Sequence, residues 1–164
     1  MLANPSLPRQ DNRVEPTPNA AGQPFVIDSR FGTLTIEVDN IIKLPNGLLG
    51  FGDHHDFGLA PLPNGQHPHF QVLQSLEEPE LAFLVAPLNL ASDTIDERDL
   101  EEACGNLGID RQSLGVLLIV TVRRNKESAE ISVNLRAPVF VDASRHVARQ
   151  YVLPNNKYSI RHAI

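Results

Sequence analysis

The sequence predicts a mainly β fold, an antiparallel sandwich or barrel of short strands interrupted by one short helix. Three observations lead to this prediction. Apolar residues alternate with polar ones at a period of two, as in strands with one buried face. The segments with this pattern are short and closely spaced. Thirteen prolines and the turn pairs Asn46-Gly47 and Asn64-Gly65 separate them.

The ends of the folded region follow from composition. Residues 1–24 combine several prolines with Asn, Gln and Ala and few large aliphatic side chains, so they cannot bury enough apolar area to offset the entropy of ordering. We therefore expect a disordered tail at 1–24 and a single domain at 25–164. A chain of 164 residues buries about two thirds of its unfolded surface without disulfides or metals.

Strands are expected in the following order. Thr33 to Val38 alternates in polarity, which places Leu34, Ile36 and Val38 on one buried face, and 41–44 is its short partner. Further strands are predicted at about 56–61, 69–74, 81–86, 115–123, 129–136, 138–141 and 147–153.

One helix is predicted near residues 97–107. Its apolar positions recur at i, i+3, i+4 and i+7 and form one stripe, namely Leu100, Ala103, Cys104 and Leu107. Asp96 can serve as N-cap with Asp99 at the third helical position, and Gly105 or Gly108 can end the helix. The lone cysteine is thus expected to be a core residue, because it has no basic neighbour to activate it.

An acidic loop precedes a strongly apolar strand. Pro79 keeps a ladder or helix from passing through Glu77, Glu78 and Glu80, whereas 81–85 is expected to be a fully buried strand. Carboxylates on a loop held by a rigid strand are well placed to bind a partner. The alternative is a turn that only improves solubility.

Charge is distributed unevenly along the chain, whose net charge is −6. Between residues 77 and 102 nine acidic residues face the single basic residue Arg98, whereas 123–161 contains eight basic and three acidic residues. An acidic face would attract a basic partner and repel nucleic acid. The alternative is that these charges intermix once the chain folds.

The sequence contains no constellation for catalysis or for a cofactor. His54 with His55 and His67 with His69 lack the further ligands that a metal site requires. There is no nucleophile elbow, phosphate-binding loop or dinucleotide fingerprint. No apolar run reaches about 18 residues, and no signal sequence is evident, so we expect a cytoplasmic protein without a membrane segment.

Five segments together are similar to the flagellar assembly factor FliW family, in the same order and spacing. They are Arg30 to Leu62, His69 to Leu88, Leu114 to Val122, Ile131 to Asp142 and Tyr158 to Ile164. The resemblance implies a single-domain, partly open antiparallel β-barrel without enzymatic activity; the residues themselves indicate no metal or cofactor. It also implies two protein partners: flagellin, and CsrA, a dimeric RNA-binding repressor of flagellin translation.

In the mechanism implied by this resemblance, abundant flagellin occupies the protein and leaves CsrA free to repress. After flagellin is secreted, the protein binds CsrA away from its RNA surface and lifts repression. Two alternatives remain, a small β-barrel enzyme that uses the acidic loop and a structural adaptor without regulatory output.

Site residues follow from combining the resemblance with the charge pattern. The first candidates for CsrA are Glu77, Glu78 and Glu80. The second candidates are the acidic residues of the helix, Asp96, Glu97, Asp99, Glu101 and Glu102. For flagellin, the apolar residues Leu48, Leu49 and Phe51 are expected to be exposed and to provide the contact. The alternative for this apolar segment is a barrel-closing turn in which Phe51 fills the core.

Overall fold

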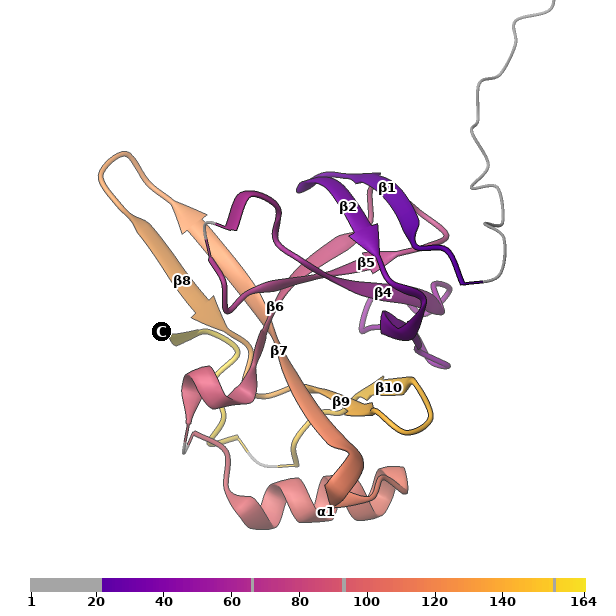
Figure 1. Ribbon diagram of the computed structural model, residues 1–164. Helices are drawn as coiled ribbons and strands as arrows, with labels where there is room; N and C mark the ends of the chain where they lie inside the picture. Colours follow the sequence, from indigo (N-terminus) through magenta and orange to yellow (C-terminus); the bar gives the residue numbers. More distant parts are fainter. Residues whose placement is uncertain (1–21, 66, 93, 155) are drawn as a thin grey trace, which may run out of the picture.

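The structure is a computed structural model that describes residues 22–65, 67–92, 94–154 and 156–164 (Figure 1). The N-terminal tail expected from the sequence lies outside the described residues up to residue 21. The strands are β1 (Phe25–Ser29), β2 (Gly32–Ile36), β3 (Ile41–Lys43), β4 (Asp56–Pro61), β5 (Gln71–Ser75), β6 (Ala82–Pro87), β7 (Leu114–Arg124), β8 (Ala129–Val133), β9 (Val139–Asp142), β10 (Val147–Gln150) and β11 (His162–Ala163). The helices are α1 (Glu97–Leu107) and the short 3-10 turns η1 (Val38–Asn40), η2 (Pro63–Gly65), η3 (Leu88–Ala91) and η4 (Arg111–Ser113).

Within the described residues, seven strands close into a ring in the order β7-β6-β5-β4-β3-β10-β9. The ring closes at β7, which pairs with β6 through its middle and with β9 through its first four residues. All neighbours are antiparallel except β3 and β10, which are parallel and share the single pair Lys43 and Val147. For the described residues, the predicted mainly β fold with one α-helix is confirmed, and its largely antiparallel strands form a sheet ring.

The interior of the ring is aliphatic and aromatic, because each ring strand contributes an inward side chain. These are Ile42, Phe57, Leu73, Val85, Leu117, Val139 and Ala148. A second cluster lies between the ring, η3, α1 and the C-terminal segment, and it contains Phe140 and Tyr158. Side chains that alternate along each strand thus build two adjoining cores, as the period-two pattern predicts.

The sheet of β1 and β2 covers β4 and β5 and adds a third apolar cluster around Leu34 and Ile36. Glycine at position 58 permits this close approach, because a Cβ there would lie 2.4 Å from Cγ2 of Ile36. Arg30 fastens the sheet to β6 by donating from Nε and Nη2 to the carbonyl oxygen of Ala82, at 3.1 and 2.8 Å.

The helix α1 spans the predicted residues and buries the predicted stripe against the second cluster, with Cys104 in the core. It ends at Gly108, whose φ of 68° is left-handed and whose N–H donates to the carbonyl of Cys104. Asp96 is the N-cap residue, but its carboxylate makes no capping bond. No helix in the described ranges has the length and apolar character needed to cross a membrane.

Several strand boundaries differ from the prediction. Val38 is not on the buried face of β2 but in η1, with 41 % of its surface exposed, because the strand ends at Ile36. β8 ends at Val133 because Oδ1 of Asn134 accepts from the N–H groups of residues 136 and 137 and turns the chain. The strand expected to be fully buried exposes part of Leu81 and Phe83. β1 and β11 were not predicted.

A two-stranded ribbon projects from the body of the molecule (Figure 1). The outer parts of β7 and β8, residues 121–131, form a two-stranded ribbon that we call the arm, and it extends to the upper left in Figure 1. Every residue from 121 to 130 is exposed. β11 pairs with β8 at the base of the arm, opposite Ser132 and Val133. The arm is therefore supported by the body only at one end.

Candidate protein-binding site

The acidic loop between β5 and β6 is held in a defined shape by two buried polar side chains. Oγ of Ser75 accepts from the N–H groups of Glu77 and Glu78, at 3.2 and 3.0 Å. The fully buried Gln74 places Nε2 2.9 to 3.2 Å from the carbonyl oxygens of residues 75, 79 and 81, which share its two N–H donors. These bonds satisfy the backbone of the loop from below, so its carboxylates are presented on a rigid support.

The exposed side chain of Glu77 makes hydrogen bonds within the molecule. Its Oε1 accepts from the backbone N–H groups of His55 and Asp56, at 2.8 Å each, and so ties the acidic loop to the segment before β4. These two hydrogen bonds hold the pKa of the Glu77 carboxyl below its usual value of 4.5, with burial acting in the opposite direction. Glu77 is therefore a structural clamp. All three residues of the predicted trio are exposed, and we expect the contact mainly from Glu78 and Glu80 because the carboxylate of Glu77 already accepts two hydrogen bonds.

Replacing Glu77 with glutamine is expected to destabilise the fold by about 1 kcal/mol near pH 7, because the two N–H groups lose a charged acceptor that is partly screened by solvent. A carboxyl whose folded pKa is lowered contributes stability above its unfolded pKa and loses it as pH falls through the folded value. The difference between wild type and Glu77→Gln should therefore shrink below about pH 4.5. Urea unfolding at several pH values measures it, with Glu78→Gln as the matched control; an equal loss in the control, or no pH dependence, contradicts the clamp.

The apolar candidates lie on the turn between β3 and β4. Leu49 is 61 % exposed and Phe51 is 39 % exposed, as predicted. The expectation for Leu48 is wrong, because this side chain is 2 % exposed and packs in the interior of the ring. Phe51 does not fill the core. It lies edge to face against Phe83 of β6, with the ring centroids 5.3 Å apart.

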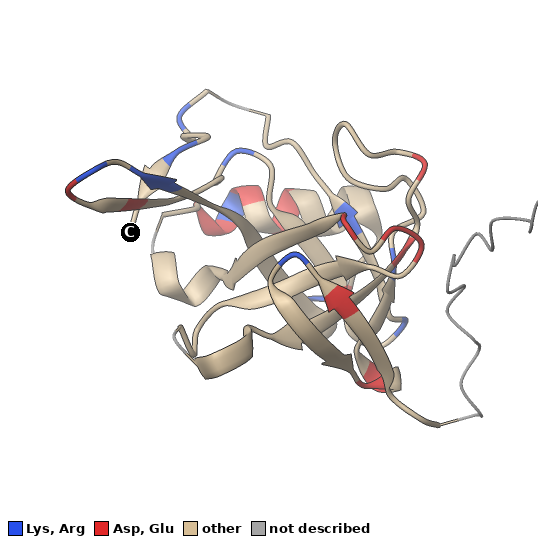
Figure 2. Cartoon of the chain, turned by 90° about the horizontal axis from the view of Figure 1, so that it is seen from above, with Lys and Arg blue, Asp and Glu red and all other residues tan. Residues whose placement is uncertain are grey.

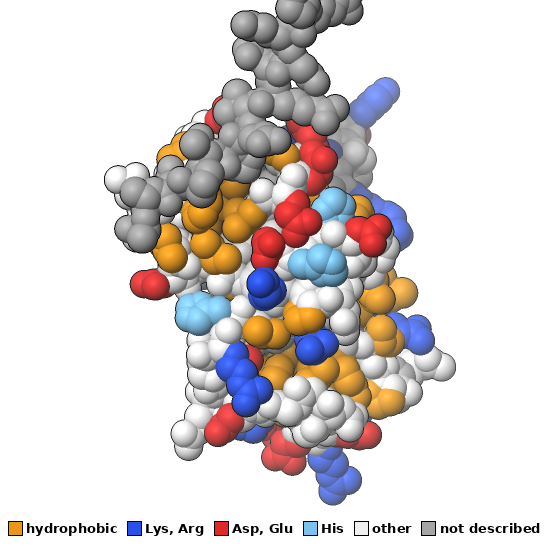
Figure 3. Space-filling model, turned by 90° about the vertical axis from the view of Figure 1, so that its right-hand side faces the viewer, with side chains coloured by type: hydrophobic (Ala, Val, Ile, Leu, Met, Phe, Trp, Pro, Cys, Tyr) orange, Lys and Arg blue, Asp and Glu red, His pale blue; other side chains and the backbone are white. Residues whose placement is uncertain are grey.

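Two sets of contacts bring this apolar turn and the acidic loop together. The Glu77 clamp joins the loop to His55 and Asp56. The contact between Phe51 and Phe83 joins the same segment to the strand that follows the loop. We call four exposed residues of the two segments, Leu49, Phe51, Glu78 and Glu80, the acidic and apolar face. In Figure 3, acidic, histidine and hydrophobic side chains lie close together in the upper half of this side of the molecule.

The acidic residues of α1 do not form one surface with the loop. α1 lies at the bottom of Figure 1, and Lys and Arg side chains separate the upper and lower acidic groups in Figure 3. Lys157 pairs with Asp96 and, at 3.2 Å, with Asp99, and Arg111 pairs with Glu97. These carboxylates raise the pKa of Lys157. Acidic and basic side chains therefore intermix around the first turn of α1, as the alternative interpretation of the charge distribution expects.

Tyr158 adds to the same network. Its hydroxyl donates to Asp99 and accepts from the N–H of Asp96, at 3.0 Å for the second bond. Burial and the Asp99 carboxylate raise the pKa of Tyr158. The C-terminal segment is thus docked on the first turn of α1. Of the predicted helix candidates, only Glu101 and Glu102 remain exposed outside these contacts.

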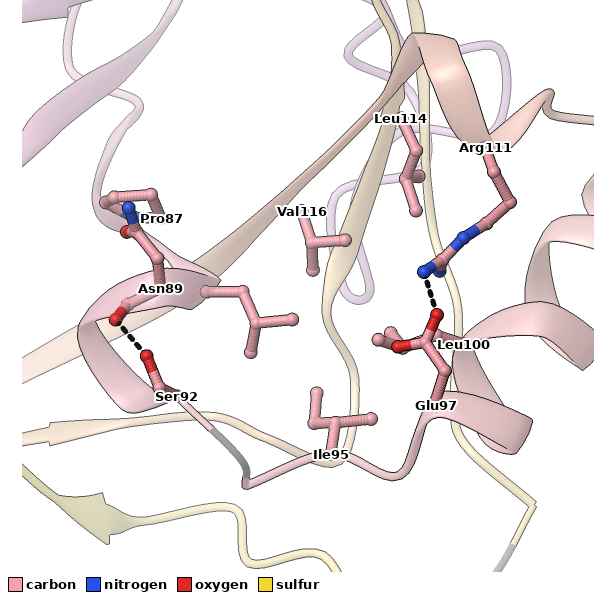
Figure 4. A pocket seen from close by; sticks show the side chains of 10 residues that line it. Pro87, Asn89, Ser92, Ile95, Glu97, Leu100, Arg111, Leu114 and Val116 are labelled. Carbon is pink, nitrogen blue, oxygen red and sulfur yellow. Dashed lines mark hydrogen bonds and ion pairs between the residues drawn. The ribbon is translucent and has the colours of Figure 1, made fainter.

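A groove of about 480 Å³ lies between η3 and α1 (Figure 4). Its floor is aliphatic, with Ile95, Leu100 and Val116 pointing into it. Its polar side chains already have partners within it: Oγ of Ser92 donates to the carbonyl of Asn89 at 2.6 Å, and Glu97 pairs with Arg111. This groove therefore combines an aliphatic floor with polar side chains from Asn89, Ser92, Glu97 and Arg111.

The histidine pairs are apart from one another. His55 contacts the carbonyl of Leu44 through Nδ1 at 3.1 Å, and His67 stacks on Phe70 with centroids 5.3 Å apart. The part of the chain that the structure describes contains no group of three or more His, Cys, Asp or Glu side chains arranged to hold a metal ion.

Comparison with known proteins agrees with this fold. The family model described as FliW protein matches residues 26–164. The flagellar assembly factor FliW of Geotalea uraniireducens is 35 % identical over 137 residues, which cover 84 % of this chain and 82 % of that protein. The one from Desulfitobacterium hafniense (strain DSM 10664 / DCB-2) is 36 % identical over 141 residues, covering 83 % and 88 %. A crystal structure of the flagellar assembly factor FliW superimposes with a TM-score of 0.64 at 22 % identity, over 84 % of this chain and 95 % of that one. The chain belongs to the FliW family of flagellar assembly factors.

Proposed function

We propose that this protein is a cytoplasmic, non-enzymatic regulator that binds flagellin and CsrA in turn. Bound flagellin leaves CsrA free to repress translation of the flagellin message. Once flagellin is secreted, the protein binds CsrA and relieves repression. Membership of the FliW family supports the role in flagellar assembly.

The exchange of one partner for the other is supported by the adjacency of the acidic loop and the apolar turn. Glu78 and Glu80 lie on the loop, Leu49 and Phe51 lie on the turn, and the Glu77 clamp and the Phe51 to Phe83 contact hold the two segments together. A standard protein interface buries about 800 Å² on each partner. Two partners centred on segments this close would overlap, so binding of one excludes the other.

Electrostatics favours the acidic loop as the contact for a basic partner. Glu78 and Glu80 are exposed, and the loop beneath them is fixed by Gln74 and Ser75. Fixed surface carboxylates accelerate encounter with a cationic surface, and close charge pairs can then slow dissociation. Exposed Glu101 and Glu102 on α1 form a second, more distant acidic site.

The two backbone hydrogen bonds of Glu77 argue against the enzyme alternative. General acid and base catalysis by paired carboxylates needs two groups that face one substrate. The carboxylate of Glu77 instead accepts two backbone N–H groups, which leaves Glu78 and Glu80 as exposed neighbours on one loop. Such neighbours do not enclose a substrate from two sides.

Affinity purification of the full chain from its native cell tests the proposed function. We expect flagellin to be recovered while export is blocked, and a CsrA homologue to be recovered while export proceeds. Recovery of neither protein under either condition contradicts the proposal. Recovery of flagellin alone, under both conditions, supports the structural adaptor instead.

A further inference from the structure

A cleft of about 300 Å³ lies at the base of the arm, beside the segment before β5. One wall is His67, His69 and Phe70, and the opposite wall includes Ile131 of β8 and Ile164 beside β11. The sheet diverges here because β6 pairs with β7 only up to Ile119, so the arm continues alone. The cleft therefore lies where the pairing of β6 with β7 ends and the pairing of β7 with β8 continues.

The register of the arm assigns its side chains to two faces. Val122 lies opposite Ile131, and Arg124 lies opposite Ala129. Directly opposed residues of antiparallel strands share a face, and alternate residues of one strand do too. Since Ile131 lines the cleft, Val122, Arg124 and Ala129 are on the same side. We call this set, with Ile131 and Ile164, the cleft face.

The two faces differ in charge. The outer face carries Arg123 directly opposite Glu130, so its charges balance across the strands. The cleft face carries Arg124 and no Asp or Glu side chain, and the facing wall carries His67 and His69. Arg124 is therefore the only charged side chain among the residues of the cleft face.

The cleft face also leaves apolar surface uncovered. Val122 is 40 % exposed, Leu90 at the edge of the cleft 36 %, and Ile164 46 %. A two-stranded ribbon in water is only marginally stable by itself. A partner that covers these side chains would stabilise the arm while burying its apolar surface.

We propose that the cleft face binds an extended peptide segment that presents aliphatic side chains to Val122, Ile131 and Ile164 and a carboxylate to Arg124. Charge complementarity selects an acidic rather than a basic segment. This surface is distinct from the acidic and apolar face: in Figure 2 the arm, which carries both basic and acidic segments, is on the left, and acidic turns lie on the right. The proposal does not depend on the identity of the flagellar partners.

The test uses the full-length protein and a fluorescein-labelled hexapeptide of alternating glutamate and leucine, with a lysine and leucine peptide as its counterpart. Fluorescence anisotropy gives the affinity for each. We expect the glutamate peptide to bind more tightly. Arg124→Glu on the cleft face should weaken its binding at least about fivefold, whereas the neighbouring Arg123→Glu on the outer face should change it less than about twofold.

Val122→Asp and Thr121→Asp repeat the comparison with a second pair of neighbours on opposite faces, and thermal unfolding verifies that each variant folds. Equal effects of the cleft-face and outer-face changes overturn the proposal. So does equal binding of the two peptides, or no binding of the glutamate peptide to the wild-type protein. A loss confined to Arg124→Glu and Val122→Asp supports it.

Discussion

Reversal of Glu78 and Glu80 to lysine is expected to weaken the binding of a CsrA-type partner by about 1–3 kcal/mol, or about 5- to 150-fold. Both side chains are exposed on a loop that Gln74 and Ser75 fix from below. The affinity that remains should depend less on salt, because long-range attraction is the part that ions screen. Titration calorimetry at low and physiological ionic strength measures both effects.

Glu77 must be left unchanged in this experiment, since it clamps the loop to His55 and Asp56. The matched control is the pair Glu101→Lys and Glu102→Lys on α1, which makes the same change in net charge at a separate place. If the control weakens binding as much as the loop variant does, the contact is not specific to the loop. If it alone weakens binding, the site is on α1.

Replacement of Leu49 by aspartate together with Phe51 by alanine is expected to weaken flagellin binding by about 2 kcal/mol or more, as at the buried centre of a protein interface. Both side chains expose apolar surface that a partner can desolvate. The cost to the fold should be smaller, mainly the edge-to-face contact with Phe83, which contributes about 0.5–1.5 kcal/mol.

The control for the apolar turn is Ile160→Asp, which removes a side chain with similar exposure, 58 %, elsewhere on the surface. Flagellin affinity and urea unfolding should be measured on the same preparations. An unchanged affinity in the double variant, with a folded protein, contradicts the apolar contact. An equal loss in Ile160→Asp shows that general hydrophobicity accounts for the binding.

Features that depend on neighbours in the sequence were predicted well. The stripe of α1 and its end at a glycine follow from helical periodicity and backbone conformation within one turn. The long strand near 115–123 is evident from its apolar run, and β7 adds one residue at each end. β11 was missed because it has two residues and exists only through pairing with β8, about thirty positions earlier.

The candidate site also has some features that the local sequence predicts and others that depend on distant residues. Exposure of Glu78 and Glu80 follows from Pro79 and the local polarity. The role of Glu77 does not, because its donors lie 21 and 22 residues away on another segment. Leu48 was assigned to the surface because its sequence neighbours are like it. Leu48 instead packs in the interior of the ring.

If both partners use the acidic and apolar face, binding of one excludes the other. A titration of flagellin into a preformed complex of this protein with CsrA decides this, with light scattering to record the mass of each species. We expect flagellin to displace CsrA completely, with an apparent affinity that falls in proportion to the CsrA concentration. A stable ternary complex, or a shift in affinity that saturates as CsrA increases, would contradict a shared surface.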